Sequence, residues 1–210
     1  SVVDREYVDL DNDPESPAPG RSDLQHSEMV RCAMCVRAVM NQYKNRYCNL
    51  FPFDANNVVL DENPDDYINA SWIDLDPEDP RKYIIAMGPM HPASYRKSRD
   101  DFGSNKTPDT CPTFWKMCFE KNVPLVIMLC EIESGFTGCS PYFPDKVNET
   151  NEYGNISVTL VEELRNVPDV IERRFRIAKP DPDPPKDLRH LQFTAWPNYQ
   201  VPESDATLAE

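Results

Sequence analysis

The sequence predicts an α/β domain, and two stretches carry the strand half of that prediction. Residues 170–178 alternate with the two-residue period of a half-buried antiparallel strand, so that Ile171, Phe175 and Ile177 share one face and charges occupy the other. The apolar run 123–130 has the length of a buried strand. Apolar residues at helical spacing elsewhere in the chain predict the helices of this α/β domain.

Capping residues and spacing place the remaining elements. Ser22 or Asp23 caps a first helix over about 24–43, in which apolar residues recur every three or four positions. Pro112 falls in the first turn of a second helix, where its fixed φ is favourable. In chain order the sequence predicts a helix at 24–43, strands near 58–60, 67–71 and 83–86, a helix near 112–121, strands at 125–129, 156–163, 170–178 and 191–194, and a last helix capped by Ser204 or Asp205.

Composition limits the class of partner. The 210 residues carry a formal net charge of −14, which argues against nucleic acid and anionic membrane as partners because both bind clustered cations. No apolar run approaches the roughly 20 residues that cross a bilayer, and the first residues have no signal-peptide features. Seven cysteines without regular spacing indicate reduced thiols. We therefore expect a cytoplasmic domain, or the cytoplasmic portion of a longer membrane protein.

A series of short motifs, taken together, resembles the protein tyrosine phosphatase family. Each motif is weak by itself, but all of them occur in the order that the family has. They are Lys-Asn-Arg-Tyr at 44–47, Asp-Tyr-Ile-Asn-Ala-Ser at 66–71, Tyr-Ile-Ile-Ala-Met-Gly-Pro at 83–89, Phe-Trp-Lys-Met at 114–117, Val-Ile-Met-Leu at 126–129 as a buried central strand, Glu-Ser-Gly at 133–135, Cys-Ser-Pro-Tyr-Phe-Pro at 139–144, His-Leu-Gln-Phe at 190–193 and Thr-Ala-Trp-Pro-Asn-Tyr-Gln-Val-Pro at 194–202.

This resemblance implies a highly twisted mixed sheet flanked by helices. It runs from residue 44 to the end of the chain and is truncated before the family's nucleophile loop. We expect a flexible acidic lead-in over 1–22 and a partial phosphatase-like domain over 23–210. The polar stretch 91–110 is longer than the family has at this point, so we expect an inserted loop there, of the kind that often carries binding function.

The loop at Trp196, Pro197 and Asn198 resembles the mobile acid loop of the family, with one change. Where the family carries an aspartic acid that protonates the departing tyrosyl oxygen, this chain has Asn198, whose amide has no titratable proton near neutral pH. General acid catalysis contributes roughly 100-fold to 10,000-fold in rate. We expect a catalytic deficit of that order.

The family's nucleophile is a cysteine followed by five residues and then a phosphate-binding arginine, and the 210 residues contain no such pair. An activated thiolate is required for that chemistry. The residues six positions after Cys32, Cys35, Cys48, Cys111, Cys118, Cys130 and Cys139 are Ala38, Asn41, Asp54, Met117, Pro124, Phe136 and Asp145. We therefore expect no complete catalytic site within these residues.

The resemblance also implies substrate-binding residues. Arg46 and Tyr47 lie in the recognition loop, where the tyrosine ring forms one wall of a phosphotyrosine slot. Asn49 stands where the family commonly has an aspartate that binds the peptide backbone, and it lacks the charge that strengthens such bonds. In the later loop, Glu133 has a supporting role and Gly138 replaces a lysine that lies near phosphotyrosine.

These departures favour a catalytically impaired domain, a pseudophosphatase that binds phosphotyrosine-containing proteins or acts as a scaffold in phosphotyrosine signalling. The first alternative is a fragment of an active phosphatase that hydrolyses phosphotyrosine on proteins. The second is an interaction module whose function lies in the 91–110 insertion. The resemblance implies no cofactor, and neither the scattered histidines nor the pair Cys32 and Cys35 indicates a metal site.

Overall fold

The computed structural model describes residues 35–47, 49–60, 66–76, 78–91, 109–132, 139, 141–180 and 183–196. All of them belong to one compact unit, Met34–Glu210. The elements are helices α2 (Val36–Met40) and α3 (Cys111–Glu120), the 3-10 helix η1 (Gln42–Lys44), and strands β1 (Ala70–Ile73), β2 (Tyr83–Ala86), β3 (Leu125–Met128), β4 (Thr150–Tyr153), β5 (Ile156–Val167), β6 (Val170–Ala178) and β7 (Lys186–Phe193). The expected lead-in over 1–22, the last helix and nearly all of the 91–110 insertion lie outside the described residues.

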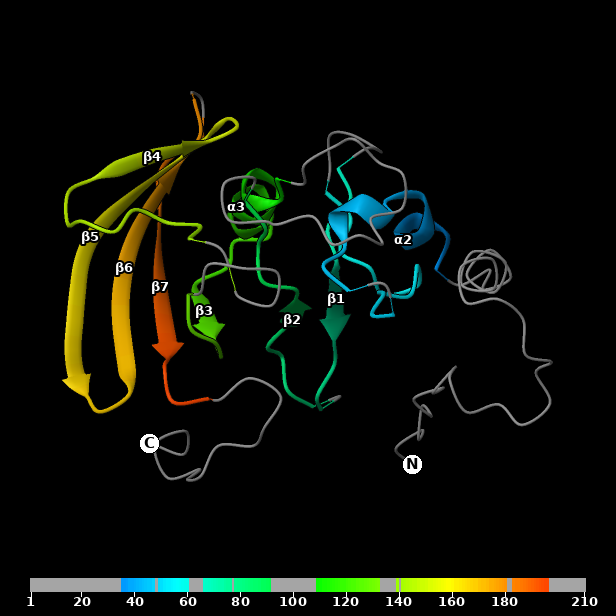
Figure 1. Ribbon diagram of the computed structural model, residues 1–210, viewed down its shortest axis with the longest axis horizontal. Coiled ribbons are helices and arrows are strands. Elements are labelled where there is room, and N and C mark those ends of the chain that lie inside the picture. The colour runs from blue at the N-terminus through cyan, green and yellow to red at the C-terminus, as the bar shows by residue number, and fades with distance from the viewer. Residues whose placement is uncertain are drawn as a thin grey trace, which may run out of the picture. The chain divides into compact units, whose positions relative to one another are not determined.

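Five strands form a mixed sheet in the order β3-β7-β6-β5-β4, as predicted for an α/β fold (Figure 1). β4 to β7 pair antiparallel with their neighbours, whereas β3 pairs parallel with β7. Tight turns join β4 to β5 and β5 to β6, with Gly154 at φ 64 and Asp169 at φ 60 in the left-handed region that glycine and aspartate tolerate. Helix α3 packs against β4, β5 and β6 and so covers one face of the sheet.

The core between α3 and the sheet is aromatic. Trp115 is fully buried, and its ring contacts Tyr142, Tyr153 and Phe175 at centroid distances of 5.6 to 6.1 Å. Its indole N–H donates to the Tyr142 carbonyl oxygen at 2.6 Å, so the one polar atom of the ring is satisfied. The C-terminal end of α3 is held by Lys186, whose amine donates to the Phe119 carbonyl at 2.7 Å and lies over the Phe119 ring.

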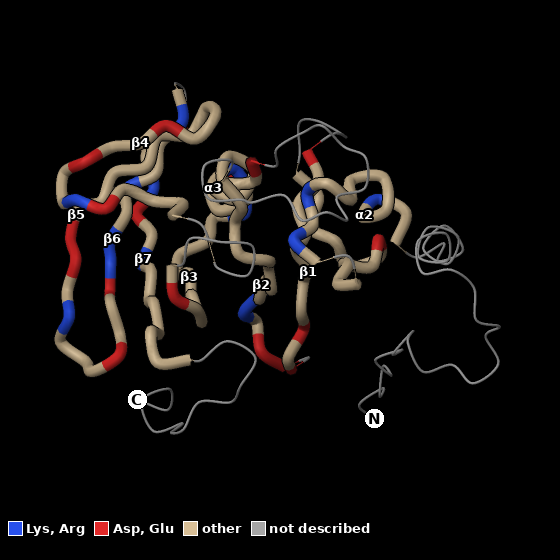
Figure 2. The backbone as a smooth tube through the Cα atoms, viewed as in Figure 1, with Lys and Arg blue, Asp and Glu red and all other residues tan. Residues whose placement is uncertain are grey.

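Acidic and basic residues are mixed along β5, β6 and β7 (Figure 2), and several of their side chains pair on the exposed side of the sheet. Arg174 pairs with Glu162, Arg176 with Asp187, and Arg189 with Glu172, at 3.0 to 3.4 Å. These pairs join neighbouring strands on the solvent side, where each contributes about 0 to 1 kcal/mol. With Arg173 buried, the pairs of Arg174 and Arg176 explain why the arginines of β6 do not form a cationic surface.

The strand predicted at 170–178 matches β6 in both bounds, but one feature of its faces was wrong. Phe175 and Ile177 are buried as expected. Arg173 lies on the same buried face and is 6% exposed, because residues two apart share a face whatever their charge. Its guanidinium donates to Glu163 at 2.8 Å and to Gln192 at 2.9 Å, which supplies the partners that a buried charge needs.

Helix α3 and strand β2 agree with the prediction, and several other elements differ from it. β1 spans Ala70–Ile73 where 67–71 was predicted, and β5 extends to Val167 where the prediction ended at 163. The first helix ends at Met40 and continues as η1, and its predicted part before residue 35 lies outside the described residues. Residues 58–60 form no strand, because backbone pairing in this segment is limited to an isolated antiparallel bridge between Asn57 and Ser71, beside which the Asn57 side chain donates to the Ile68 and Ala70 carbonyls. β4 was not predicted, since its sequence is polar, and β7 begins at residue 186 rather than 191.

Strand β3 forms where predicted, but it is not buried on both faces. Among the described residues it pairs only with β7, at the edge of the five-stranded sheet. Met128 faces the core at 5% exposure, whereas Ile127 points away from α3 and is 60% exposed. A continuous apolar run could not distinguish one covered face from two. Among the described residues, no helix is long and apolar enough to cross a membrane.

His190 is a buried titratable group in the middle of this core. It is fully buried on β7, with Nε2 at 2.7 Å from the Tyr142 hydroxyl and aromatic contacts to Phe143 and Phe175. Burial, and next the charge of Arg173, lower the pKa of His190 to about 3. The unfolded chain therefore binds a proton near pH 6.5 that the folded chain excludes.

We expect this difference to make the fold acid-sensitive. As pH falls from about 6.5 towards 3, the contribution of His190 to the free energy of unfolding should decrease by up to about 1.4 kcal/mol per pH unit. Urea denaturation at several pH values between 7 and 4 measures the slope of the free energy of unfolding against pH. His190→Gln should flatten it relative to the parent, whereas His91→Gln should leave it unchanged. Equal slopes for the parent and His190→Gln would contradict this account.

Candidate functional site

Asn45 lies in the recognition loop predicted at 44–47. It is buried, and its side chain makes several hydrogen bonds. The Asn45 amide donates to the Ala38 carbonyl at 3.1 Å, which fixes the loop to α2. Its Oδ1 accepts from the Tyr67 hydroxyl at 2.8 Å and from the Asn69 amide at 2.9 Å. Burial raises the pKa of Tyr67, so its phenol remains a neutral donor. Two separate sequence motifs are thus joined by one side-chain oxygen.

Asn69 holds the other end of the same loop. Its amide also donates to the Leu50 carbonyl at 2.8 Å, so both the first and the last residue of the stretch 45–50 are tied to one side chain. Between these ties, Tyr47 is half-buried and Asn49 is exposed. The loop conformation therefore depends on Asn45 and Asn69 rather than on regular secondary structure.

Arg46 fastens the loop to the segment that follows β2. It is 6% exposed, and its Nη2 donates to the carbonyls of Gly88 and Pro89 at 3.1 and 3.0 Å. Its backbone N–H lies 3.0 Å from the Met87 thioether sulfur. The predicted contact of Arg46 with substrate stays a prediction, but these bonds give Arg46 a second role, because they set the backbone on which Tyr47 stands.

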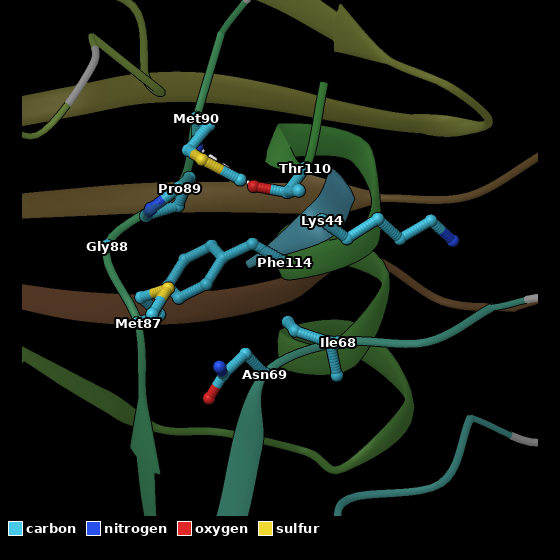
Figure 3. Close-up of a pocket in the computed structure, with 9 residues that line it drawn as sticks. All are labelled: Lys44, Ile68, Asn69, Met87, Gly88, Pro89, Met90, Thr110 and Phe114. Atoms are coloured by element: carbon cyan, nitrogen blue, oxygen red, sulfur yellow. Dashed lines mark hydrogen bonds between the residues drawn. The ribbon is translucent and has the colours of Figure 1, made fainter. Parts of the chain in front are cut away.

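A shallow pocket lies beside this loop (Figure 3). Most of its wall is apolar, and its nine lining residues include one charged side chain, Lys44, which extends away from Met87 and Phe114 in the close-up. Such a wall, with a single cation at its edge, does not resemble a phosphate cradle. The lining residues are Lys44, Ile68, Asn69, Met87, Gly88, Pro89, Met90, Thr110 and Phe114.

Gly88 is required where this wall meets the core. A Cβ at this position would lie 3.0 Å from the Cys139 sulfur, which is closer than side chains normally approach. The glycine thus lets the loop segment pack directly on Cys139. Gly88 thus contacts both the sulfur of Cys139 and, through its carbonyl, the guanidinium of Arg46.

The acid-loop side of the predicted site is described only at its beginning. After β7, Thr194 donates its N–H to the Asp169 carbonyl at 2.8 Å, which fixes the exit of the strand, and Trp196 is half-buried. Pro197 and Asn198 lie outside the described residues, as do Glu133 and Gly138. Their predicted roles rest on the sequence.

Sequence reasoning missed the polar tie that aligns the ends of β3 and β7. Gln192 accepts from Arg173 at 2.9 Å and donates to the Cys130 carbonyl at 3.1 Å, immediately after β3. Glu163 on β5 accepts a hydrogen bond from the same Arg173 guanidinium. The only sequence signal was that Arg173 shares its strand face with Phe175, which indicates a buried charge in need of partners.

Three of the described cysteines, Cys111, Cys118 and Cys139, are not activated thiols. Burial raises the pKa of Cys111 and Cys118, and the hydrogen bond from Cys130 together with burial raises the pKa of Cys139. These thiols are therefore protonated at neutral pH and poor nucleophiles. Within the described part of the chain, no group of His, Cys, Asp and Glu side chains is placed to hold a metal ion.

Comparisons with known proteins agree with the motif order. A family model described as protein-tyrosine phosphatase matches residues 41–210. Receptor-type tyrosine-protein phosphatase C of Rattus norvegicus is 36% identical over 173 residues, or 80% of this chain and 12% of the relative. Tyrosine-protein phosphatase non-receptor type 4 of Mus musculus is 32% identical over 176 residues, 82% of this chain and 17% of the relative. The chain thus spans a small part of the curated relatives it matches.

The buried role of Arg46 predicts a large effect on stability. Arg46→Met keeps the length of the side chain but leaves the Gly88 and Pro89 carbonyls without their donor, so we expect a loss of about 2 to 4 kcal/mol in the free energy of unfolding. Arg81→Met is the matched control, since Arg81 pairs with Asp79 on the surface, and it should change stability by about 0.5 kcal/mol or less. Chemical denaturation compares the two, and equal losses would contradict the assignment.

Proposed function

This chain belongs to the protein tyrosine phosphatase family, and from that premise we propose that it recognises phosphotyrosine while its catalysis is impaired. It would act as a phosphotyrosine-binding or scaffolding domain in phosphotyrosine signalling. The observation that carries the proposal is Asn198, which stands at the general-acid position of a loop that otherwise keeps the family's pattern. An amide cannot protonate the departing tyrosyl oxygen.

The geometry of the recognition loop supports retained binding. Tyr47 is the proposed wall of the phosphotyrosine slot, and the ties from Asn45, Arg46 and Asn69 hold its backbone in one conformation. Pre-organisation of this kind lowers the entropic cost of binding. Asn49 is exposed beside it and can accept one hydrogen bond from a peptide backbone, without the strength that a carboxylate adds.

The chemistry of the remaining positions supports impaired catalysis. Gly138 removes a cation that would lie near the phosphate, and Glu133 is the proposed supporting carboxylate of the same loop. Together with Asn198 in place of the acid, the change at Gly138 would weaken the family's reaction.

An active phosphatase is the second candidate. The names of the curated relatives and the intact recognition loop favour it. In that case phosphotyrosine on proteins is the substrate, and water or another group replaces the acid at Asn198. For either candidate we place the domain in the cytoplasm, or in the cytoplasmic portion of a membrane protein, with a phosphotyrosine-containing protein as partner.

Binding is tested by substitution of Tyr47. In the full-length protein, Tyr47→Ala should weaken affinity for a phosphotyrosine peptide by about 10-fold to 100-fold, because an aromatic anchor in a slot contributes roughly 1 to 3 kcal/mol. Fluorescence polarisation measures the affinity, with the unphosphorylated peptide as the blank. Tyr43→Ala, a half-buried tyrosine in η1, is the control and should keep parental affinity. If the parent binds both peptides equally, the recognition proposal is wrong.

The proposal that catalysis is impaired is tested by substitution of Asn198. If the lost acid limits the reaction, Asn198→Asp should raise turnover of an aryl phosphate by the full-length protein by roughly 100-fold to 10,000-fold. Asn155→Asp, on the exposed turn between β4 and β5, adds the same charge and should change nothing. No turnover by either protein supports a pseudophosphatase that also lacks the nucleophile. Fast parental turnover that Asn198→Asp leaves unchanged favours the active phosphatase.

A further inference from the structure

Arg173 on β6 carries a buried charge that contacts three other parts of the chain. Its guanidinium donates to Glu163 on β5 at 2.8 Å and to Gln192 on β7 at 2.9 Å. The same group lies 4.7 Å from the centre of the Phe143 ring. A guanidinium can bind a carboxylate, an amide and a ring face together, because its donors form a rigid planar fork. Arg173 therefore fixes three segments around one charge.

Gln192 extends this contact to the end of β3. It is 4% exposed, its Oε1 accepts from Arg173, and its Nε2 donates to the Cys130 carbonyl at 3.1 Å. An amide has its acceptor on one side and its donors on the other, so a guanidinium that holds the oxygen directs the NH₂ group away from itself. Arg173 thus orients the donor that binds Cys130.

These bonds lie where two strands of the predicted site end. β3 is parallel to β7, with Met128 opposite Gln192, so the carboxyl ends of both strands lie at the same edge of the sheet. The chain that leaves β7 at this edge reaches Trp196 three residues after Phe193, and Asn198 two residues later in the sequence. The bonds of Gln192 therefore determine where the chain that leads to the acid loop begins.

The recognition loop is fixed by a different set of bonds. Asn45, Arg46 and Asn69 bind partners in α2, in the segment before β1, in the loop itself and in the segment after β2. The partners of Arg173 lie on β5, on β7 and in the segment that contains Phe143. These two sets of bonds have no residue in common. A change at Arg173 can therefore move the exit of β7 while the recognition loop keeps its own bonds.

We propose that Arg173 is a positioning residue for the acid loop, which it places through Gln192 by holding the end of β7 against the end of β3. Its effect on turnover rests on the proposed function, because the acid position matters only where phosphotyrosine is hydrolysed. Turnover depends strongly on such placement, since a displacement of about 1 Å can cost roughly 100-fold in rate. Recognition depends on the other set of bonds and should not change.

Hydrogen exchange of the full-length protein tests the placement without any assay of activity. Arg173→Lys keeps the charge beside Glu163, but one ammonium cannot replace both arms of the fork between Glu163 and Gln192. The amides of 129–132 and 194–196 should therefore exchange about 2-fold to 10-fold faster than in the parent, as expected for the loss of one hydrogen bond.

A second variant and a control make this measurement decisive. Gln192→Glu can still accept from Arg173 but has no N–H group for the Cys130 carbonyl, so at pH 8 it should also speed exchange at 129–132. Arg174→Lys is the control, because Arg174 pairs with Glu162 on the solvent side, and it should change nothing. Parental exchange at 129–132 in both test variants, or equally faster exchange over the whole chain, overturns the proposal.

Steady-state kinetics separate positioning from recognition. In full-length Asn198→Asp, the addition of Arg173→Lys should lower kcat for an aryl phosphate by about 10-fold or more and leave KM within about 2-fold. Addition of Arg174→Lys should change neither constant. A raised KM with unchanged kcat would assign Arg173 to recognition and overturn the proposal. If Asn198→Asp shows no turnover, the protein lacks more than the acid, and the exchange rates alone decide whether Arg173 positions the strand ends.

Discussion

The described part of the predicted site depends on one constraint, that buried polar groups must be hydrogen-bonded. The recognition loop has no ladder of its own, and it is fixed because the Asn45 oxygen accepts from Tyr67 and Asn69 at once. Removal of any of these partners leaves a buried donor or acceptor unsatisfied, at a cost of about 1 to 3 kcal/mol. The same hydrogen bonds therefore fix the loop conformation and stabilise the fold. They also link two segments that lie far apart in the sequence.

The fold could be predicted where local pattern and burial agree. β6 alternates because one face meets α3 and the other meets solvent, and α3 begins at Cys111 with Pro112 in its first turn. β4 was not predicted because its sequence is polar and has no buried apolar face. It forms a strand because the turn at Gly154 pairs it with β5. The exposed side of β3 escaped prediction because composition does not state which layers cover a sheet.

The site residues that the sequence predicts stay predictions, and their connections could not be predicted from the sequence. The motif at 44–47 pointed to Arg46 and Tyr47, yet nothing local indicates that Arg46 binds two carbonyls some forty residues away. The same holds for Arg173 and Gln192, whose partners come from three other elements. Long-range hydrogen bonds depend on the packed fold, so a sequence can flag a buried charge without naming what satisfies it.

Recognition and catalysis are built from different kinds of residue, and this difference explains how one can persist without the other. Asn45, Arg46 and Asn69 bind other parts of the chain, so their loss destabilises the fold whatever the protein does. A general acid contributes to the rate through its proton, and a change from aspartate to asparagine keeps the size of the side chain while it removes that proton. Selection for a folded domain therefore preserves the recognition loop automatically, whereas the acid position is preserved only by selection for turnover. The proposal that binding is retained without turnover therefore combines Asn198 in the sequence with a recognition loop that is held by contacts needed for the fold.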